Sequence, residues 1–127
     1  GFRRDIPVLV RASLATILAS EQEGLPNCVM ESLCMETPVI GSNIRGTRDL
    51  LEDGYGLLFE TGDVKGLAAS IAYLSDNPQE ARSMGEKGRK SLSNYDVPSI
   101  LQKYESLYNE ALCLKSKQIN QYSTQKT

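Results

Sequence analysis

Two carboxylates, Glu23 and Glu31, enclose a short segment that could hold a hydroxylated ligand. A carboxylate accepts hydrogen bonds and donates none, so the vicinal hydroxyls of a ribose or a hexose are natural partners for it. A plainer interpretation is also open at this point. Glu31 could be an exposed helix residue paired with a base, and Glu23 could be a solvated loop acid. Spacing alone does not decide between the two.

The residues between these carboxylates predict the start of a helix. Gly24 allows the backbone to approach a ligand closely, and Pro26 presets the first helical turn without removing a needed donor. The free N–H groups of Asn27, Cys28 and Val29 would then point outward, with the positive end of the helix dipole behind them. Such a helix start is suited to a phosphate or a diphosphate.

The composition excludes several other kinds of chemistry. The 127 residues contain no histidine, which rules out Ser-His-Asp and Cys-His systems, an imidazole base and a histidine-ligated metal. Cys28, Cys34 and Cys113 are odd in number and show no CxxC spacing, so we interpret them as buried small hydrophobic side chains in a reducing compartment. Any chemistry must therefore come from carboxylates and backbone dipoles.

Charge and hydropathy limit the partners. The net charge of -2 gives no electrostatic reason to bind nucleic acid or an anionic membrane surface. No apolar run approaches the roughly 20 residues of a membrane span, and no signal-peptide pattern opens the chain. We expect a cytoplasmic protein with no membrane span and no nucleic-acid partner.

Short apolar strands alternate with helices along the chain, which predicts an α/β fold with a parallel sheet. The predicted strands are 14–19, 37–41 and 56–59, and the predicted helices begin after Asp5 and then cover 27–35, 47–52, 64–74, 79–92 and 99–114. In open sheets of this kind ligands bind at the carboxyl ends of strands, where Glu23 to Asn27 would lie. Three strands are few for a doubly wound domain, so we interpret the chain as the second half of one.

Several segments in a fixed order resemble one enzyme family. Glu23-Gly-Leu-Pro-Asn-Cys-Val-Met-Glu31 has the E-x7-E pattern, Gly1-Phe-Arg-Arg-Asp-Ile6 precedes it, and 37–42, 43–50 and 56–63 follow it. Together they resemble the retaining GT-B glycosyltransferases, most closely the GT4-type glycosyl transferases group 1. The resemblance covers about residues 1–112 and implies the C-terminal, donor-binding portion of such an enzyme: a partial Rossmann-like sheet of about three strands with several C-terminal helices. Residues 113–127 are interpreted as a frayed polar tail.

The resemblance also implies roles for the candidate residues. Glu31 would hold the ribose of a nucleotide-sugar donor, and Glu23 would position a hydroxyl of the transferred sugar in the catalytic site. The other donor-binding positions would be Arg3 near the base, the backbone around Gly24, Leu25 and Asn27, and the amides of Cys28 and Val29 facing the diphosphate. The donor would be a UDP- or GDP-sugar, and no tightly bound metal or cofactor is expected.

Parts of the family pattern are absent from this chain. The Arg and Lys that clamp the diphosphate, and the N-terminal domain that binds the acceptor, would precede Gly1. Arg45 and Arg48 could replace the clamp, but we interpret them as solvated loop side chains. The apolar face of the last helix, with Tyr104 and Leu107, could contact the missing domain, pack on this half-domain, or support a homodimer.

The sequence thus predicts a fragment of a glycosyltransferase that transfers a sugar, with retention, to a saccharide or lipid-linked acceptor. The whole enzyme would work in the cytoplasm, at the inner face of the membrane where the acceptor is lipid-linked, and the fragment alone would be inactive. Two alternatives are a nucleotide-sugar epimerase of the same fold and a non-catalytic folding or oligomerisation module.

Overall fold

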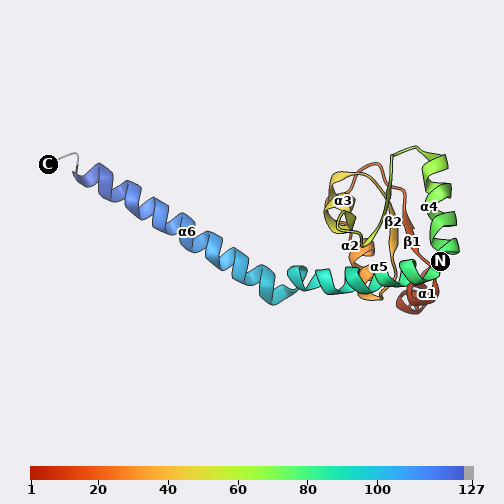
Figure 1. The fold of residues 1–127 in the computed structure, drawn as a ribbon. Coiled ribbons are helices and arrows are strands. Elements are labelled where there is room, and N and C mark those ends of the chain that lie inside the picture. Colours follow the sequence, from red (N-terminus) through yellow and green to blue (C-terminus); the bar gives the residue numbers. More distant parts are fainter. Residues whose placement is uncertain (125–127) are drawn as a thin grey trace. The chain divides into compact units, whose positions relative to one another are not determined.

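The computed structural model describes residues 1–124, with side chains described up to residue 115. It divides into two compact units, the first covering Gly1–Leu92 and the second beginning at Ser93. The first unit contains α1 (Ile6–Ala12), β1 (Thr16–Leu18), α2 (Asn27–Cys34), β2 (Val39–Ser42), α3 (Arg45–Leu51), β3 (Gly56–Phe59), α4 (Val64–Asp76) and α5 (Pro78–Ser91). The 3-10 helix η1 (Leu92–Tyr95) and the long helix α6 (Val97–Thr124) complete the described chain (Figure 1).

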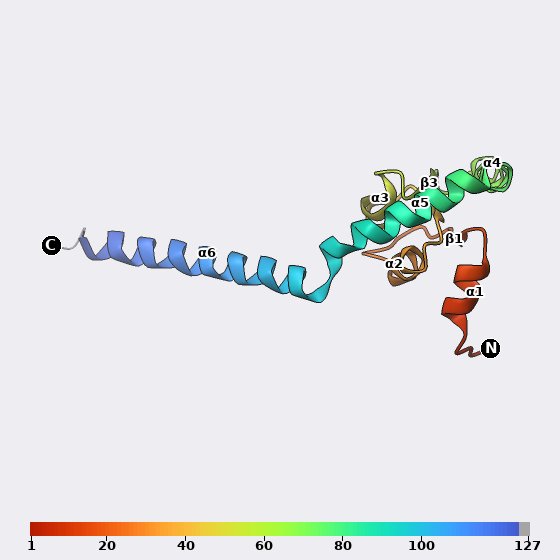
Figure 2. The same ribbon diagram turned by 60° about the horizontal axis from the view of Figure 1, so that its bottom comes forward.

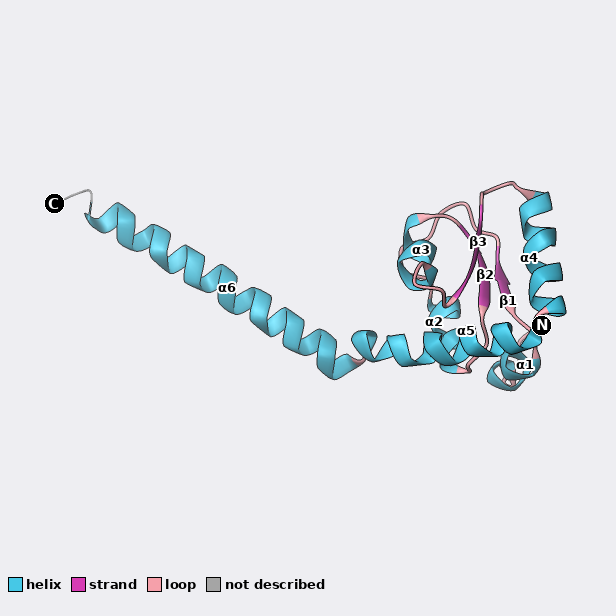
Figure 3. Cartoon of the chain, viewed as in Figure 1, coloured by secondary structure: helices cyan, strands magenta, loops and turns pink. Residues whose placement is uncertain are grey.

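The three strands form one parallel sheet in the order β1-β2-β3 (Figure 3). In the register Ile17 pairs with Ile40, and Ile40 pairs with Leu57. The predicted fold class, a small parallel α/β sheet with helices after it, is confirmed. The prediction for β3 matches the observed bounds, whereas β1 is shorter than the predicted 14–19.

Helices cover both faces of this sheet, and Figure 1 shows α3 and α4 on opposite sides of the strands. Consecutive residues of β2 therefore enter two different cores, because side chains alternate across a strand. Val39 packs in the first core and Ile40 in the second. The first core also contains Val29, Leu33, Leu50 and Leu51, and the second contains Phe59, Leu74 and Ala81.

The start of α4 is defined by a side-chain cap. The Asp63 carboxylate accepts a hydrogen bond of 2.9 Å from the Gly66 amide, as favoured N-caps do. Asp5 precedes α1 in the same way but makes no such cap, because its carboxylate is bound to Arg3. Asn77 and Pro78 end α4 where the sequence predicts, since proline cannot continue the helix before it.

The prediction of buried cysteines is wrong. Cys28, Cys34 and Cys113 are all exposed. Leu33 is fully buried on the face of α2 that packs into the core. Cys34, the next residue, lies on the outward face and lines the groove between α1 and α2. Helical spacing placed both in one apolar stripe, and the edge of such a stripe is where periodicity discriminates least.

The last helix is longer than predicted, since α6 begins at Val97 and extends to Thr124 rather than ending at 114. An Asp96 carboxylate oxygen accepts a hydrogen bond of 2.9 Å from the Ser99 amide at its start, and the pKa of Asp96 is lowered mainly by its bonding to Ser99. Tyr104, Leu107 and Tyr108 are exposed on the helix. Residues 125–127 of the predicted frayed tail lie outside the described residues.

Candidate functional site

The loop after β1 carries the first predicted carboxylate. Glu23 is half-buried, and its carboxylate accepts a hydrogen bond of 2.8 Å from the Ser20 hydroxyl. Gly24 and Leu25 are exposed, and Pro26 is buried as the residue that precedes α2. The loop therefore lies at the carboxyl end of β1 as predicted, and Ser20, which sequence reasoning did not single out, orients the Glu23 side chain.

The first turn of α2 offers fewer donors than predicted. The Val29 amide donates a hydrogen bond of 3.1 Å to the Pro26 carbonyl, so it is already engaged. The amides of Asn27 and Cys28 have no partner within residues 1–124. An anion at this helix start would therefore meet Asn27 and Cys28 first, because the 3-10-type bond to Pro26 withdraws Val29.

Glu31 lies one turn beyond Asn27, and both residues line a groove of about 570 Å³ between α1 and α2. The opposite wall consists of Ile6, Pro7 and Val10 from α1. Figure 2 shows α1 near α2, on the side of the sheet where β1 lies. The groove combines apolar walls with one carboxylate, which suits a flat ring with hydroxyl groups at one end. The α1 wall is a part of the site that sequence reasoning missed.

Arg3 lies before α1 and is engaged by its neighbour. Its guanidinium donates two hydrogen bonds to the Asp5 carboxylate, of 2.9 Å and 2.6 Å. These bonds hold the pKa of Asp5 below its usual value. The Arg3 side chain is therefore paired with Asp5, and the pair is half-exposed at the surface.

The carboxyl ends of β2 and β3 are joined by a second network. Arg48 donates a hydrogen bond of 2.7 Å from Nε to the Asn43 side-chain oxygen, and the Asn43 amide donates one of 2.6 Å to Glu60. Arg48 is exposed, as expected of a solvated side chain, but it belongs to α3 rather than to a loop and binds the β2–α3 turn. Arg45 is exposed as expected.

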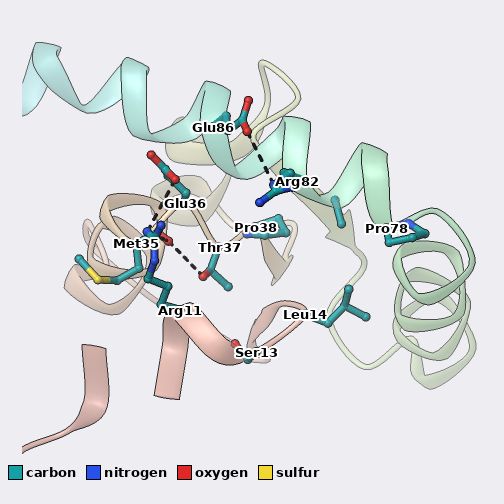
Figure 4. Close-up of a pocket in the computed structure, with 11 residues that line it drawn as sticks. Arg11, Ser13, Leu14, Met35, Glu36, Thr37, Pro38, Pro78, Arg82 and Glu86 are labelled. Atoms are coloured by element: carbon teal, nitrogen blue, oxygen red, sulfur yellow. Dashed lines mark hydrogen bonds and ion pairs between the residues drawn. The ribbon is translucent and has the colours of Figure 1, made fainter. Parts of the chain in front are cut away.

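A different pocket, of about 280 Å³, lies at the amino ends of the strands, next to Leu14 and Pro38 (Figure 4). Its charges are balanced within the chain. Glu36 lies 3.6 Å from Arg11, and Glu86 lies 3.9 Å from Arg82. Because these charges already compensate one another, the pocket is a weaker candidate than the groove.

Within the described part of the chain, no group of three or more Cys, Asp or Glu residues is arranged to hold a metal ion. None of the helices described is both long enough and apolar enough to cross a membrane.

The family model of the glycosyl transferases group 1 matches residues 1–91. The chain therefore belongs to the glycosyl transferases group 1 family, which confirms the resemblance seen in its motifs.

Three curated relatives show how much of a whole protein this chain represents. EpsD of Bacillus subtilis, which carries a provisional glycosyltransferase name, is 29% identical over 93% of this chain, and the match spans 31% of EpsD. The capsular polysaccharide biosynthesis glycosyltransferase CapM of Staphylococcus aureus is 32% identical over 76% of the chain, spanning 26% of CapM. A UDP-Gal:α-D-GlcNAc-diphosphoundecaprenol α-1,3-galactosyltransferase of Escherichia coli is 28% identical over 85% of it, spanning 28% of that enzyme.

A solved structure supports the same assignment. The sucrose-phosphate synthase of Thermosynechococcus elongatus superposes with a TM-score of 0.75 at 25% identity, over 84% of this chain and 27% of that chain. The chain thus spans between about a quarter and a third of the length of each of these four proteins.

Proposed function

We propose that this chain is the donor-binding portion of a glycosyltransferase that uses a nucleoside-diphosphate sugar, UDP- or GDP-linked. The observation that carries the proposal is the groove between α1 and α2, because it holds Glu31 and Asn27 at the start of a helix with unpaired amides. The E. coli relative names a UDP-sugar donor and a lipid diphosphate acceptor, which favours this class of substrates.

Each part of the donor has a matching group in the site. Glu31 accepts hydrogen bonds from the ribose hydroxyls, and the apolar wall of α1 packs against the base. The amides of Asn27 and Cys28 bind the diphosphate with the dipole of α2 behind them. Glu23, held by Ser20, positions the transferred sugar, together with the backbone of Gly24 and Leu25.

The whole enzyme transfers the sugar with retention to a saccharide or lipid-linked acceptor, at the inner face of the membrane where the acceptor is lipid-linked. Stabilisation of the departing nucleoside diphosphate supplies most of the rate. We place acceptor binding in the remainder of the parent enzyme, because this chain spans only 31% of EpsD and 26% of CapM. The exposed apolar face of α6, which includes Tyr104 and Leu107, contacts that part of the enzyme or a second copy.

The isolated chain is expected to transfer no sugar, because it spans only 31% of EpsD and 26% of CapM. The measurement is release of UDP or GDP from the corresponding hexose donors in the presence of saccharide acceptors. Turnover by the 127-residue chain alone would contradict this expectation. The epimerase alternative predicts a changed sugar with no acceptor present, and product analysis of the same reactions distinguishes it.

Cysteine alkylation provides a direct test of the groove. Cys34 lines the groove, whereas Cys113 belongs to α6 of the second unit and is not among the lining residues, and both are exposed. Saturating UDP or GDP is expected to slow alkylation of Cys34 by iodoacetamide, because a bound nucleotide covers its thiol, and to leave Cys113 unchanged. Mass spectrometry of the digested chain measures both sites in one sample. Equal rates at Cys34 with and without each nucleotide would argue against a nucleotide in this groove.

A further inference from the structure

The loop that carries Glu23 rests on the first turn of α3. Gly46 is buried there, and a Cβ atom built on it would lie 1.8 Å from the Gly24 carbonyl oxygen and 3.1 Å from that of Glu23. Real Cβ atoms essentially never approach backbone oxygens this closely. The bare Cα of Gly46 therefore lets the loop backbone lie directly against α3, and any side chain at this position would displace it.

The start of α3 is fixed independently of the loop. The Asn43 amide nitrogen donates a hydrogen bond of 2.7 Å to the Phe59 carbonyl, and its side chain joins Arg48 to Glu60. Thr47 is fully buried over Gly41 of β2. Displacement forced by a larger residue at position 46 would therefore fall on the loop rather than on α3.

The loop has few other attachments of its own. Ser20 binds the Glu23 side chain, and the Ser42 hydroxyl donates a hydrogen bond of 3.4 Å to the Leu18 carbonyl at the end of β1. Gly24 and Leu25 are exposed. The contact with Gly46 is therefore the closest constraint on how far the loop backbone lies from α3.

We infer that Gly46 is a positioning residue of the donor site: it sets the place of the Glu23–Gly24 backbone, which leads into α2, against the first turn of α3, without contacting the donor itself. This inference rests on the proposed function for its catalytic meaning. Its structural content, that residue 46 controls the loop, can be tested without any ligand.

The test compares Gly46→Ala with Gly85→Ala. Gly85 is an equally crowded glycine, since its Cβ would lie 2.0 Å from the Glu36 carbonyl oxygen, but it contacts the segment after the C-terminal end of α2. The two variants add the same methyl group against a backbone carbonyl. A general loss of packing would therefore affect the loop and the nucleotide affinity equally in both variants. A positioning role of Gly46 would affect them in Gly46→Ala only.

Amide NMR spectra of the two variants, without nucleotide, provide the first readout. Gly46→Ala is expected to shift the amides of residues 20–28 and to speed their hydrogen exchange, whereas Gly85→Ala affects those around Glu36. Unshifted loop amides in a folded Gly46→Ala chain would overturn the inference. If Gly46→Ala does not fold, Asn43→Ala is the second variant, because it removes the side chain that joins Arg48 of α3 to Glu60 and so loosens the start of α3. Unchanged hydrogen exchange of the amides of residues 20–28 in Asn43→Ala would then overturn the inference.

Titration with UDP, GDP and ADP provides the second readout. Gly46→Ala is expected to weaken binding of the best of the three roughly 10-fold to 100-fold. The displaced loop leads directly into the Asn27 and Cys28 amides and moves them away from the diphosphate, an effect of the size of one lost hydrogen bond to a charged group. Gly85→Ala should leave that affinity unchanged. Equal losses in both variants would overturn a specific role for Gly46. If the unmodified chain binds none of the three nucleotides, the proposed function fails, and the loop amides alone decide the role of Gly46.

Discussion

Replacing Glu31 by alanine is expected to weaken binding of the preferred nucleoside diphosphate by about 10-fold to 100-fold. A hydrogen bond to a charged group contributes roughly 1.5–3 kcal/mol, and a loss of 10-fold to 100-fold corresponds to about 1.4–2.8 kcal/mol, so the loss of one ribose hydroxyl bond to the Glu31 carboxylate accounts for it. The effect should arise without loss of stability, because Glu31 is exposed and no salt bridge is found for it within the described residues. An amide NMR titration of the chain with UDP, GDP and ADP measures the affinity.

The matched control is Glu105→Ala, which removes the same charge from an exposed position on α6. It should bind the nucleotide as the unmodified chain does. Substitution by Gln separates charge from shape, since Glu31→Gln keeps one acceptor and should lose less than Glu31→Ala. Shifts that cluster at residues 24–31 and survive in Glu31→Ala would show that the ribose is held elsewhere.

Truncating Leu33 to alanine should lower the free energy of unfolding by about 3 kcal/mol, the largest loss of stability among the substitutions proposed for this chain. Leu33 is fully buried on the inner face of α2, and its Cδ2 lies 2.6 Å from the place that a Cβ on Gly88 would occupy. Removing its methyl groups leaves a cavity between α2 and α5 that packed backbone cannot close. Urea unfolding followed by circular dichroism measures the change.

The same truncation at Leu107 is the control, because that leucine is 58% exposed on α6. Its effect should stay within about 0.5 kcal/mol, as for most surface positions. Comparable losses at both positions would contradict the placement of Leu33 in the core that supports α2. Because Glu31 lies on the outer face of α2, unfolded chains cannot bind the nucleotide. Leu33→Ala should therefore also weaken nucleotide binding under conditions in which part of the variant is unfolded.

The sequence predicts well those features that depend on residues close together in the chain. Alternating short strands and amphipathic helices gave the parallel α/β class, and Asn77-Pro78 marked the end of α4 within a residue. The E-x7-E segment placed Glu23 and Glu31 at the start of α2 because strand, loop and helix follow one another directly. Such features depend on neighbours in the chain, so a single sequence contains them.

The features that sequence missed depend on contacts between distant segments. Nothing local tells that the Gly24 carbonyl lies on Gly46, or that α1 forms the second wall of the groove. The Val29 amide bonds to the Pro26 carbonyl, three residues earlier, as in a 3-10 helix. A helix can begin with such a turn or with an α turn, and the sequence does not distinguish the two. The bond between the exposed Arg48 and Asn43 was likewise missed, because Asn43 is oriented by Glu60, which follows β3 and is distant in sequence.

Glu36 illustrates a further limit. It is a non-glycine residue with a positive φ, of 58°, at the end of α2. Local rules favour glycine there, yet the glutamate lies 3.6 Å from Arg11 and 3.5 Å from Arg89. The ion pairs, which connect it to α1 and α5, offset part of the backbone strain.

The position of β2 between the two cores has a consequence for how the first unit melts. Val39 and Ile40 are neighbours in sequence and belong to different cores. A slip of β2 by one residue would exchange their faces and disrupt both cores at once. Neither core can therefore be lost alone, and Gly1–Leu92 should unfold in a single cooperative step, with no stable intermediate in which only one face of the sheet has opened.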